Sequence, residues 1–252
     1  MVDRNTLVGY CNKLLVTDAF HDYCPNGLQV EGAQQVQRIV TGVTASQDLL
    51  DAAVAAQADL LLVHHGYFWK GEPAAITGIK QRRLKTLLTN DLNLLAYHLP
   101  LDVHPELGNN VQLAKLLGWQ ITGPLEVGNP RSVGLQGELP AAQSGEQLAQ
   151  ALASALGREP LFIAGHQRPV KRIAWCTGAA QGYIDKAIGL GVDAFVTGEV
   201  SEPTVHAARE NGINFYAAGH HATERYGVQA LGEHLAQQFS VEHRFIDMDN
   251  PV

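Results

Sequence analysis

Residues 59–65 read Asp-Leu-Leu-Leu-Val-His-His, a short apolar run that ends in two histidines just before Gly66. A run of this length and composition predicts a buried β-strand. Upstream of it, residues 37–43 predict another strand and residues 46–57 predict a helix. The order strand, helix, strand predicts a mainly parallel sheet with right-handed crossover connections.

The same order recurs in the second half of the chain. Arg38-Ile39-Val40 aligns with Arg172-Ile173-Ala174 after a shift of 134 residues, and the run 60–63 then falls on 194–197 without a gap. Sequence identity between the halves is low, so chance agreement is the alternative. Agreement of strand, helix and strand in phase favours a divergent duplication. The other elements that we expect are helices at 5–15, 80–88 and 110–117 and a strand at 94–97.

The fold class that follows is α/β, with two similar α/β domains. We predict a first domain of residues 1–125 and a second of residues 126–252. Gly and Pro cluster between Thr122 and Pro130, which favours a linker there. The C-terminal segment remains free to pack back on the first domain.

Composition excludes several classes of protein. The chain has 252 residues, a formal net charge of -7 and scattered Lys and Arg, so it lacks the basic stripe of a nucleic-acid-binding surface. The polar N-terminus predicts no signal peptide, and no apolar run is long enough for a membrane span. Cys11, Cys24 and Cys176 are odd in number and far apart, which indicates a reducing, cytoplasmic location.

His64 and His65 stand just past a predicted strand end, the edge at which α/β sheets place their sites. Successive residues of an extended chain point in opposite directions, so one metal ion cannot easily take both rings. Two ions a few ångströms apart could take one ring each, and a carboxylate could bridge them. Imidazole and carboxylate are ligands for zinc, iron and manganese. The alternative is a pair of hydrogen-bonded polar caps.

The strand at 94–97 leads into His98, and Asp102 follows four residues later. Pro100 lies between them and holds the preceding residue extended, so we expect a stiff loop rather than a helix. A lone aspartate in such a loop is usually a turn or cap residue. His104 is expected to be a solvated loop residue.

The second half carries a similar pattern at residues 219–227, Gly-His-His-Ala-Thr-Glu-Arg-Tyr-Gly. If a helix begins at Ala222, His220 lies at its mouth and Glu224 in its first turn, where a carboxylate is stabilised. The alternative is a capping arrangement in which Glu224 pairs with Arg225. We favour metal ligands, because His220 and Glu224 supply what the first half lacks for two complete coordination shells.

These motifs together resemble one family, the dinuclear-metal proteins named GTP cyclohydrolase 1 type 2 homologues, or Nif-three-like proteins. The resemblance covers essentially the whole chain. The motifs that carry it occur in order: Asn26-Gly27-Leu28-Gln29, His64-His65-Gly66, Tyr97-His98-Leu99-Pro100-Leu101-Asp102, Gly108-Asn109-Asn110, Thr197-Gly198-Glu199 and Gly219-His220-His221-Ala222-Thr223-Glu224.

The resemblance implies two α/β domains with a pair of divalent metal ions in the cleft between them, and a ring-shaped homohexamer. It implies that Glu224 bridges the metals and that the ligands are His64, His65, Asp102, His220 and Glu224. His98 and Glu199 match positions close to the metals, so they are candidates either to support a ligand or to transfer protons. The chain resembles the short form, without an additional domain between the halves.

Several functions fit this ligand set. A metal-dependent hydrolase would direct water at the ring of a purine nucleotide, as GTP cyclohydrolase chemistry requires, or at a phosphoester. The chain has no P-loop, so a triphosphate would need the metals and side chains such as Lys70, Arg82, Arg83 or Arg225. The alternatives are a non-enzymatic metal carrier or regulator, and a scaffold that binds a protein partner, for which 67–69 (Tyr-Phe-Trp) could supply an apolar patch or a lid.

Overall fold

In the computed structural model, which describes residues 1–252, the apolar run 60–63 forms the middle strand of the larger sheet of unit 1, the first of two units. The bounds of these units differ from those of the predicted domains, because residues 108–125 belong to unit 2 and residues 227–249 to unit 1. Unit 1 comprises Met1–Leu107 and Gly227–Asp249, and unit 2 comprises Gly108–Tyr226 and Asn250–Val252.

The larger sheet of unit 1 has five strands, and four of them are parallel. Only the edge strand β2 runs antiparallel to its neighbour β6. Strands β1 and β3 form a separate two-stranded antiparallel ribbon. In sheet order the strands are β13 (Glu242–Phe245), β4 (Arg38–Thr44), β5 (Leu60–His65), β6 (Asn93–Ala96) and β2 (Gly27–Val30), and the ribbon consists of β1 (Val2–Asp3) and β3 (Gln35–Val36).

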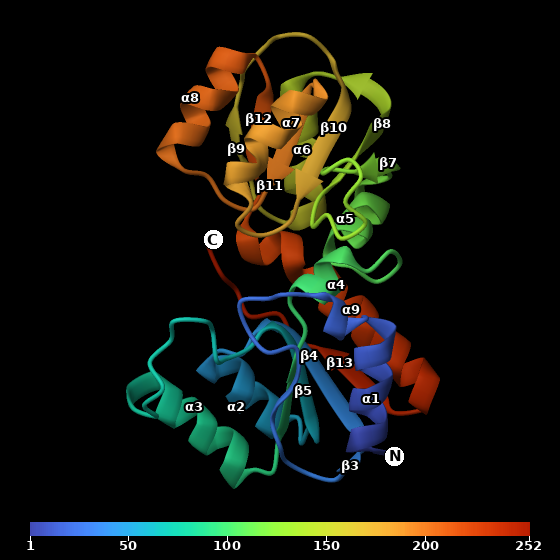
Figure 1. Ribbon diagram of the computed structural model, residues 1–252, viewed down its shortest axis with the longest axis vertical. Helices are drawn as coiled ribbons and strands as arrows, with labels where there is room; N and C mark the ends of the chain where they lie inside the picture. The colour runs from blue at the N-terminus through green and yellow to red at the C-terminus, as the bar shows by residue number, and fades with distance from the viewer. The chain divides into compact units, whose positions relative to one another are not determined.

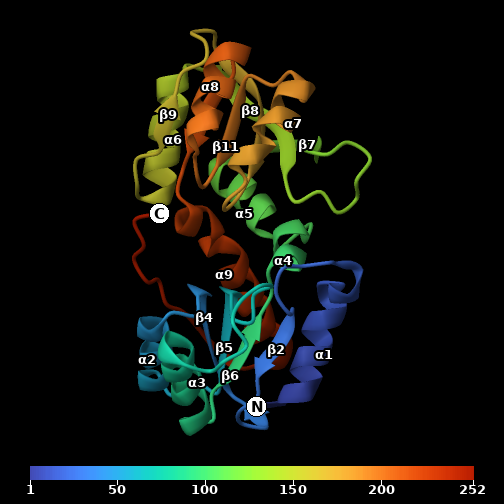
Figure 2. The ribbon, with the colours of Figure 1, turned by 60° about the vertical axis from the view of Figure 1, so that its left-hand side comes forward.

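Successive side chains of β5 point to opposite faces of the sheet, and both faces are covered by helices (Figures 1 and 2). Leu60 and Leu62 pack with α1 and the second part of α9, whereas Leu61 and Val63 pack with α2 and α3. Each of these four side chains is fully buried. Burial of that kind stabilises the fold by about 1.5–3 kcal/mol per side chain. The helices are α1 (Arg4–Leu14), η1 (Thr17–Ala19), α2 (Gln47–Ala55), α3 (Gly78–Thr89), α4 (Leu99–Val103) and α9 (His220–Phe239).

Unit 2 has a six-stranded sheet whose centre is again parallel, through β10, β11 and β12. The strands on either side of this centre are antiparallel to their neighbours. Helices α5 and α6 pack on the face of Ile173 and Trp175, and α7 and α8 pack on the face of Ala174 and Phe195. In sheet order the strands are β7 (Gln120–Pro124), β8 (Leu135–Gln143), β10 (Val170–Cys176), β11 (Ala194–Thr197), β12 (Asn214–Ala217) and β9 (Leu161–Ile163). The helices are α5 (Asn109–Leu117), α6 (Gly145–Leu156), η2 (Gln181–Tyr183), α7 (Ile184–Leu190) and α8 (Glu202–Asn211).

The repeat predicted from the 134-residue shift reappears in the strand register. Ile39 pairs with Leu60 in unit 1, and the shifted pair Ile173 and Ala194 is in register in unit 2. Hydrogen bonds to an aspartate repeat as well. Oδ2 of Asp59 accepts from the backbone N–H groups of residues 37 and 38, and Oδ2 of Asp193 accepts from those of residues 171 and 172. The two units therefore share a β-α-β framework, as a divergent duplication predicts.

One local expectation near the site is wrong, and one helix begins earlier than the start that was considered. Residues 99–103 form the short helix α4 instead of a stiff loop, with Pro100 in its first turn. Proline is tolerated there because its missing N–H would have no partner within the helix in any case. Helix α9 begins at His220, two residues earlier than the expected start at Ala222.

The segment 122–130 is not simply a linker, since it begins within β7, an edge strand of the unit 2 sheet. An edge strand tolerates Pro124 because one side of the strand needs no ladder hydrogen bond. The boundary between the units falls instead at Leu107 and Gly108, and again within α9 at Tyr226 and Gly227.

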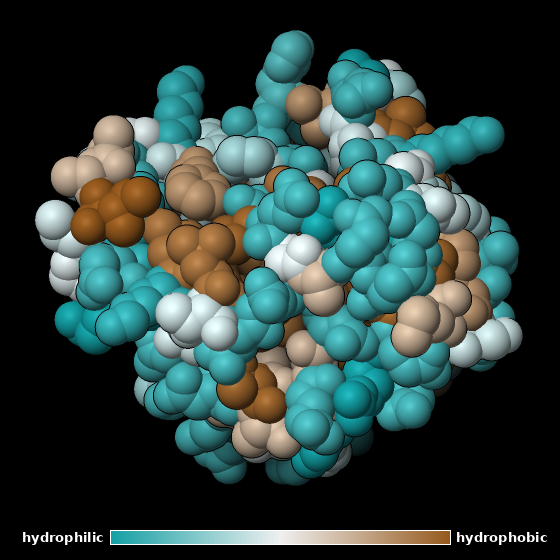
Figure 3. Space-filling model, turned by 90° about the horizontal axis from the view of Figure 1, so that it is seen from below, coloured by the Kyte–Doolittle hydropathy of each residue, from teal (hydrophilic) through white to brown (hydrophobic).

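The surface of unit 1 seen in Figure 3 is mainly hydrophilic, with apolar side chains scattered across it. Ile76, Ile79 and Leu88, in and beside α3, are among the large apolar side chains exposed in this unit. None of the helices is both long and apolar enough to span a membrane.

Candidate metal centre

In unit 1, three histidines gather at the carboxyl ends of β5 and β6. The donor nitrogens of His64, His65 and His98 all lie within 4.8 Å of one another, close enough to hold a metal ion. The rings of His64 and His65 are 4.6 Å apart between centroids, with an interplanar angle of 45°. His64 is fully buried, whereas His65 and His98 are partly exposed.

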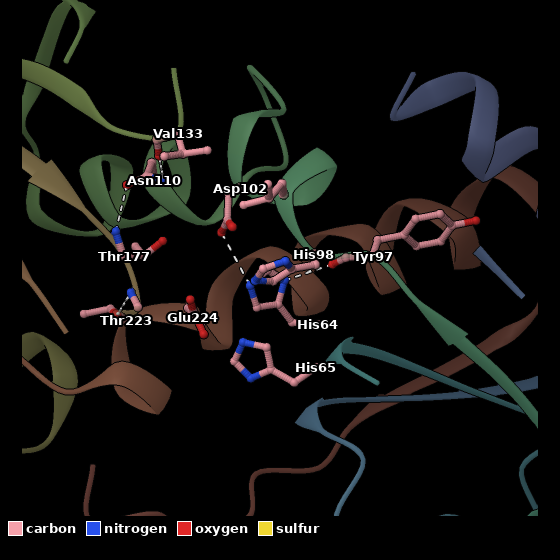
Figure 4. Close-up of polar contacts among 12 residues, drawn as sticks. His64, His65, Tyr97, His98, Asp102, Asn110, Val133, Thr177, Thr223 and Glu224 are labelled. Carbon is pink, nitrogen blue, oxygen red and sulfur yellow. Dashed lines mark hydrogen bonds and ion pairs between the residues drawn. The ribbon is translucent and has the colours of Figure 1, made fainter. Parts of the chain in front are cut away.

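Each of these rings is held through its Nδ1 atom. Nδ1 of His64 donates to the carbonyl oxygen of Tyr97 at 2.9 Å, on the β6 side of β5 (Figure 4). Nδ1 of His65 lies 3.1 Å from Oγ1 of Thr44, at the end of β4. The strands on either side of β5 therefore orient the two adjacent rings.

His98 is held by a buried carboxylate that sequence reasoning missed. Its Nδ1 donates to Oδ1 of Asp22 at 2.7 Å, and Oδ2 of Asp22 accepts from the backbone N–H of Leu99 at 2.9 Å. Asn26 adds a hydrogen bond to Asp22 and accepts one from the His98 backbone N–H. Burial acts to raise the pKa of Asp22, but the bonds from His98 and Asn26 and the charge of His98 outweigh it and lower the pKa to about 2.

Asp102 completes the unit 1 group. It lies in the first turn of α4, and its Oδ1 is 3.5 Å from Nε2 of His64 (Figure 4). Its side chain is only 9% exposed. His104, just past this helix, accepts at Nδ1 from the backbone N–H groups of Glu106 and Leu107, so it caps a turn.

In unit 2, His220 stands between two carboxylates. Its Nδ1 donates to Oε1 of Glu199 at 2.7 Å, and its Nε2 lies 3.1 Å from Oε2 of Glu224, one turn further along α9. Burial lowers the pKa of His220, but Glu224 and Glu199 together raise it to about 9. Arg225 donates to the carbonyl oxygen of Leu156 at the end of α6.

A tight turn after β10 makes room for Glu224, and sequence reasoning missed this turn as well. A Cβ atom on Gly178 would lie 2.1 Å from Oε1 of Glu224, and the residue has a φ of +72°. The backbone N–H of Gly178 donates to Oγ1 of Thr223, and that of Thr177 donates to Oδ1 of Asn110 (Figure 4). The 134-residue shift would have placed Gly178 opposite Thr44, which supports His65 in unit 1.

A cavity of about 380 Å³ opens beside Glu199 in unit 2. Its wall includes Gly198, Ala217 and Arg158. The guanidinium of Arg158 donates to the backbone oxygen of Pro251, which also lines the cavity. This space is large enough for part of a small molecule, and it lies next to the carboxylate that holds His220.

The chemistry of these donors fits a divalent metal. Histidine ligands commonly have their other ring nitrogen held by a carboxylate, a carbonyl oxygen or water, which fixes the tautomer. His64, His98 and His220 each donate from Nδ1 to such an oxygen. Asp102 and Glu224 add buried carboxylate oxygens. The fold and these groups define a two-unit α/β protein that carries groups of histidine and carboxylate able to bind metal.

Comparison with known proteins agrees with this class and confirms the resemblance seen in the sequence. Residues 2–251 match the model of the family Duf34/NIF3 (NGG1p interacting factor 3), and the chain belongs to this family. A relative named GTP cyclohydrolase 1 type 2 homolog from Pseudomonas aeruginosa is 65% identical over 98% of both chains. The relative of the same name from Yersinia pestis is 60% identical over 96% of both chains.

Solved structures have the same fold. A structural-genomics structure described as protein ybgI, of unknown function, superposes with a TM-score of 0.96 at 54% identity and covers 100% of both chains. The structure of TTHA1606 from Thermus thermophilus gives a TM-score of 0.90 at 37% identity, again over 100% of both chains.

Proposed function

We propose that this chain binds two divalent metal ions, zinc, iron or manganese, through His64, His65, Asp102, His220 and Glu224, with Glu224 as the bridging ligand. The observation that carries this proposal is the arrangement of the histidines, whose Nδ1 atoms are held by oxygen atoms within each unit. Such support is typical of metal ligands and would be an unusual coincidence among surface histidines.

We further propose that the metals serve hydrolysis of a small molecule, in the manner of GTP cyclohydrolase 1 type 2, on the ring of a purine nucleotide. Five protein ligands for two ions leave coordination positions open, as in catalytic sites and unlike closed structural sites. Bound metals would supply Lewis acidity and lower the pKa of water toward neutrality. The cavity beside Glu199 supports a small-molecule substrate over a protein partner.

The residues next to the ligands have separate roles in this proposal. Glu199 orients His220 by accepting the Nδ1–H bond, so we assign it a positioning role. His98 is oriented by Asp22 through Nδ1, which leaves its Nε2 to give or take a proton. Hydrolysis of a phosphoester would use the same residues, and a carrier function would use the ligands without His98.

We also propose that the chain assembles into a homohexameric ring and works in the cytoplasm. The ring is what the family resemblance described above implies, and the chain matches the family model over residues 2–251. The three cysteines are buried and form no disulfide, which fits a reducing compartment. Light scattering on the purified protein would give its mass in solution, and a monomer or dimer would contradict the ring.

The decisive experiment begins with protein purified without added metal. Elemental analysis and titration should give about two equivalents of divalent metal per chain. The loaded protein is then assayed on GTP, other nucleotides and simple phosphoesters, with the chelated protein as control. A single site on titration would refute the dinuclear centre, and two bound ions without turnover on the whole panel would favour the carrier.

A further inference from the structure

Two loops of unit 1 meet beside His98 and brace each other. The first runs from Asp22 into β2, as far as Gln29, and the second runs from Gly66 to Glu72. The Lys70 backbone N–H donates to the carbonyl oxygen of Tyr23 at 2.6 Å. Gln29 accepts from the backbone N–H of Tyr67 at 2.7 Å and donates to its carbonyl oxygen at 3.1 Å. The pair is therefore a built wall and not two independent loops.

The second loop contains a backbone conformation that a bulky residue rarely adopts. Phe68 has a φ of +64°. Residues held in this region cluster at ligand sites, where the surrounding contacts enforce them. Here Lys80 lies over the Phe68 ring, 5.3 Å from its centroid, and the Tyr67 hydroxyl donates to the carbonyl oxygen of Ala45 at 2.8 Å. This turn orients the residue that follows, Trp69.

Trp69 is fixed and only partly buried. Its indole N–H donates to the carbonyl oxygen of Gly66 at 3.1 Å, and its backbone N–H donates to Oε2 of Glu72 at 3.1 Å. The indole lies 5.1 Å from the His98 ring and 6.0 Å from the His65 ring, centroid to centroid. The indole is nearly perpendicular to the His98 ring, at an interplanar angle of 84°, and is fixed beside the imidazole cluster.

Tyr23 contributes a second ring to the same wall. Its centroid is 6.5 Å from that of His98, at an interplanar angle of 65°, and the residue is 63% exposed. Its backbone N–H donates to Oδ1 of Asp22, the carboxylate that orients His98. An exposed aromatic residue tied by its backbone to a buried functional group is well placed for a ligand.

We propose that Trp69 and Tyr23 form the subsite for a flat heteroaromatic ring, a purine nucleobase, beside His98. This inference rests on the proposed hydrolase function and deepens it by assigning residues to the substrate's ring. Aromatic side chains bind bases through stacking, which tolerates any base because each has a π-face. His98, held by Asp22, can hydrogen-bond with the edge of that ring.

The test uses the full metal-loaded chain and guanosine as the probe, with ribose 5-phosphate as the control ligand. Binding is measured by calorimetry for Trp69→Ala, Tyr23→Ala and the conservative Trp69→Phe. Tyr183→Ala, which removes a partly exposed ring of unit 2, is the matched control. Thermal midpoints identify any variant that fails to fold, and Trp69→Phe then carries the test.

Loss of an aromatic stack weakens base binding by about 5- to 150-fold. We expect that weakening for guanosine with Trp69→Ala and Tyr23→Ala, partial retention with Trp69→Phe, and no change with Tyr183→Ala. Guanosine affinity that is unchanged in both alanine variants, or absent in the wild type, overturns the subsite. A change in oligomeric mass without a change in guanosine affinity overturns it as well and makes Tyr23 an interface residue.

The subsite and the proposed function fail in different ways. Guanosine binding that depends on Trp69, in a protein that turns over no substrate, supports the subsite and refutes the hydrolase. Metal-dependent turnover, together with guanosine affinity that is unchanged in Trp69→Ala and Tyr23→Ala, supports the hydrolase and refutes the subsite.

Discussion

The carboxylate of Asp22 lies 2.7 Å from Nδ1 of His98, across 76 residues of chain. The same carboxylate accepts from two backbone N–H groups and one side-chain amide. Its side chain is only 2% exposed. Asp22 therefore orients the histidine and joins the N-terminal loop to the end of β6.

Asp22→Asn should lower stability at pH 7 by about 2–3 kcal/mol, since charged hydrogen bonds are lost around a buried group. The folded-state pKa of Asp22, about 2, is below its usual value of 3.8. Its contribution is therefore complete above pH 4 and is lost as pH falls toward 2. Urea unfolding from pH 7 to 2 should show a flatter acid limb for the variant. The exposed Asp18→Asn variant should match the wild type.

Glu224→Ala should lose more metal than His98→Ala. A bridging carboxylate contacts both ions and offsets their repulsion, whereas a supporting histidine affects affinity by only about 10–100-fold. Metal content per chain after dialysis against a weak chelator measures the difference. Equal losses in the two variants would make His98 a direct ligand, which its position among the unit 1 histidines would also permit.

The metal-free and metal-loaded proteins should respond oppositely to pH. With a folded-state pKa of about 9, His220 stabilises the metal-free protein at pH 6.5 and below, and this stability is lost as pH rises through 9. Metal needs the neutral imidazole, so its affinity rises over the same range. The gap between the two thermal midpoints should widen from pH 6.5 to 9.

His220→Gln should abolish that widening, because it removes the titrating ring. The control is His206→Gln, which removes an exposed histidine that also pairs with a glutamate one turn away on its own helix. Widening that persists in His220→Gln would assign the effect to another group.

Gly178→Ala should destabilise unit 2 by about 1–3 kcal/mol, because the position is left-handed and its Cβ would overlap the Glu224 carboxylate. Metal content should fall with it. Gly182→Ala is a sharp control, since its Cβ would meet no atom within 4 Å. Equal stability and metal content in the two variants would show that the turn at Gly178 accommodates a Cβ atom without loss of stability.

The repeated aspartates should be equally important to their units. Asp59→Ala and Asp193→Ala each remove the acceptor of two backbone N–H groups, which costs about 0.5–1.5 kcal/mol per hydrogen bond. Chemical denaturation should show similar losses for both variants, and little loss for the exposed Asp48→Ala. A large loss of stability in only one of the two variants would mean that the equivalent aspartates contribute differently to the free energy of unfolding.

The local pattern predicted the strands well because it depends on burial of neighbouring residues. The apolar side chains of the run 60–63 predict burial on both faces of a sheet. The histidines that follow are then expected at the carboxyl end of the strand, at the sheet edge. The same logic placed residues 194–197, and the 134-residue shift related the two. Pattern failed at Pro100, where the restriction that proline places on the preceding residue was taken to exclude a helix, although Pro100 lies in the first turn of α4.

By itself, therefore, the sequence determined the α/β class, the family and the residue types at each strand end, because hydrophobic periodicity and motif order depend only on the order of residues. Only the tertiary structure decided what orients the histidines. Asp22, Thr44 and the Tyr97 carbonyl reach His98, His65 and His64 from 21 to 76 residues away. Sequence spacing carries no information about such contacts, because strand order and loop packing bring these groups together.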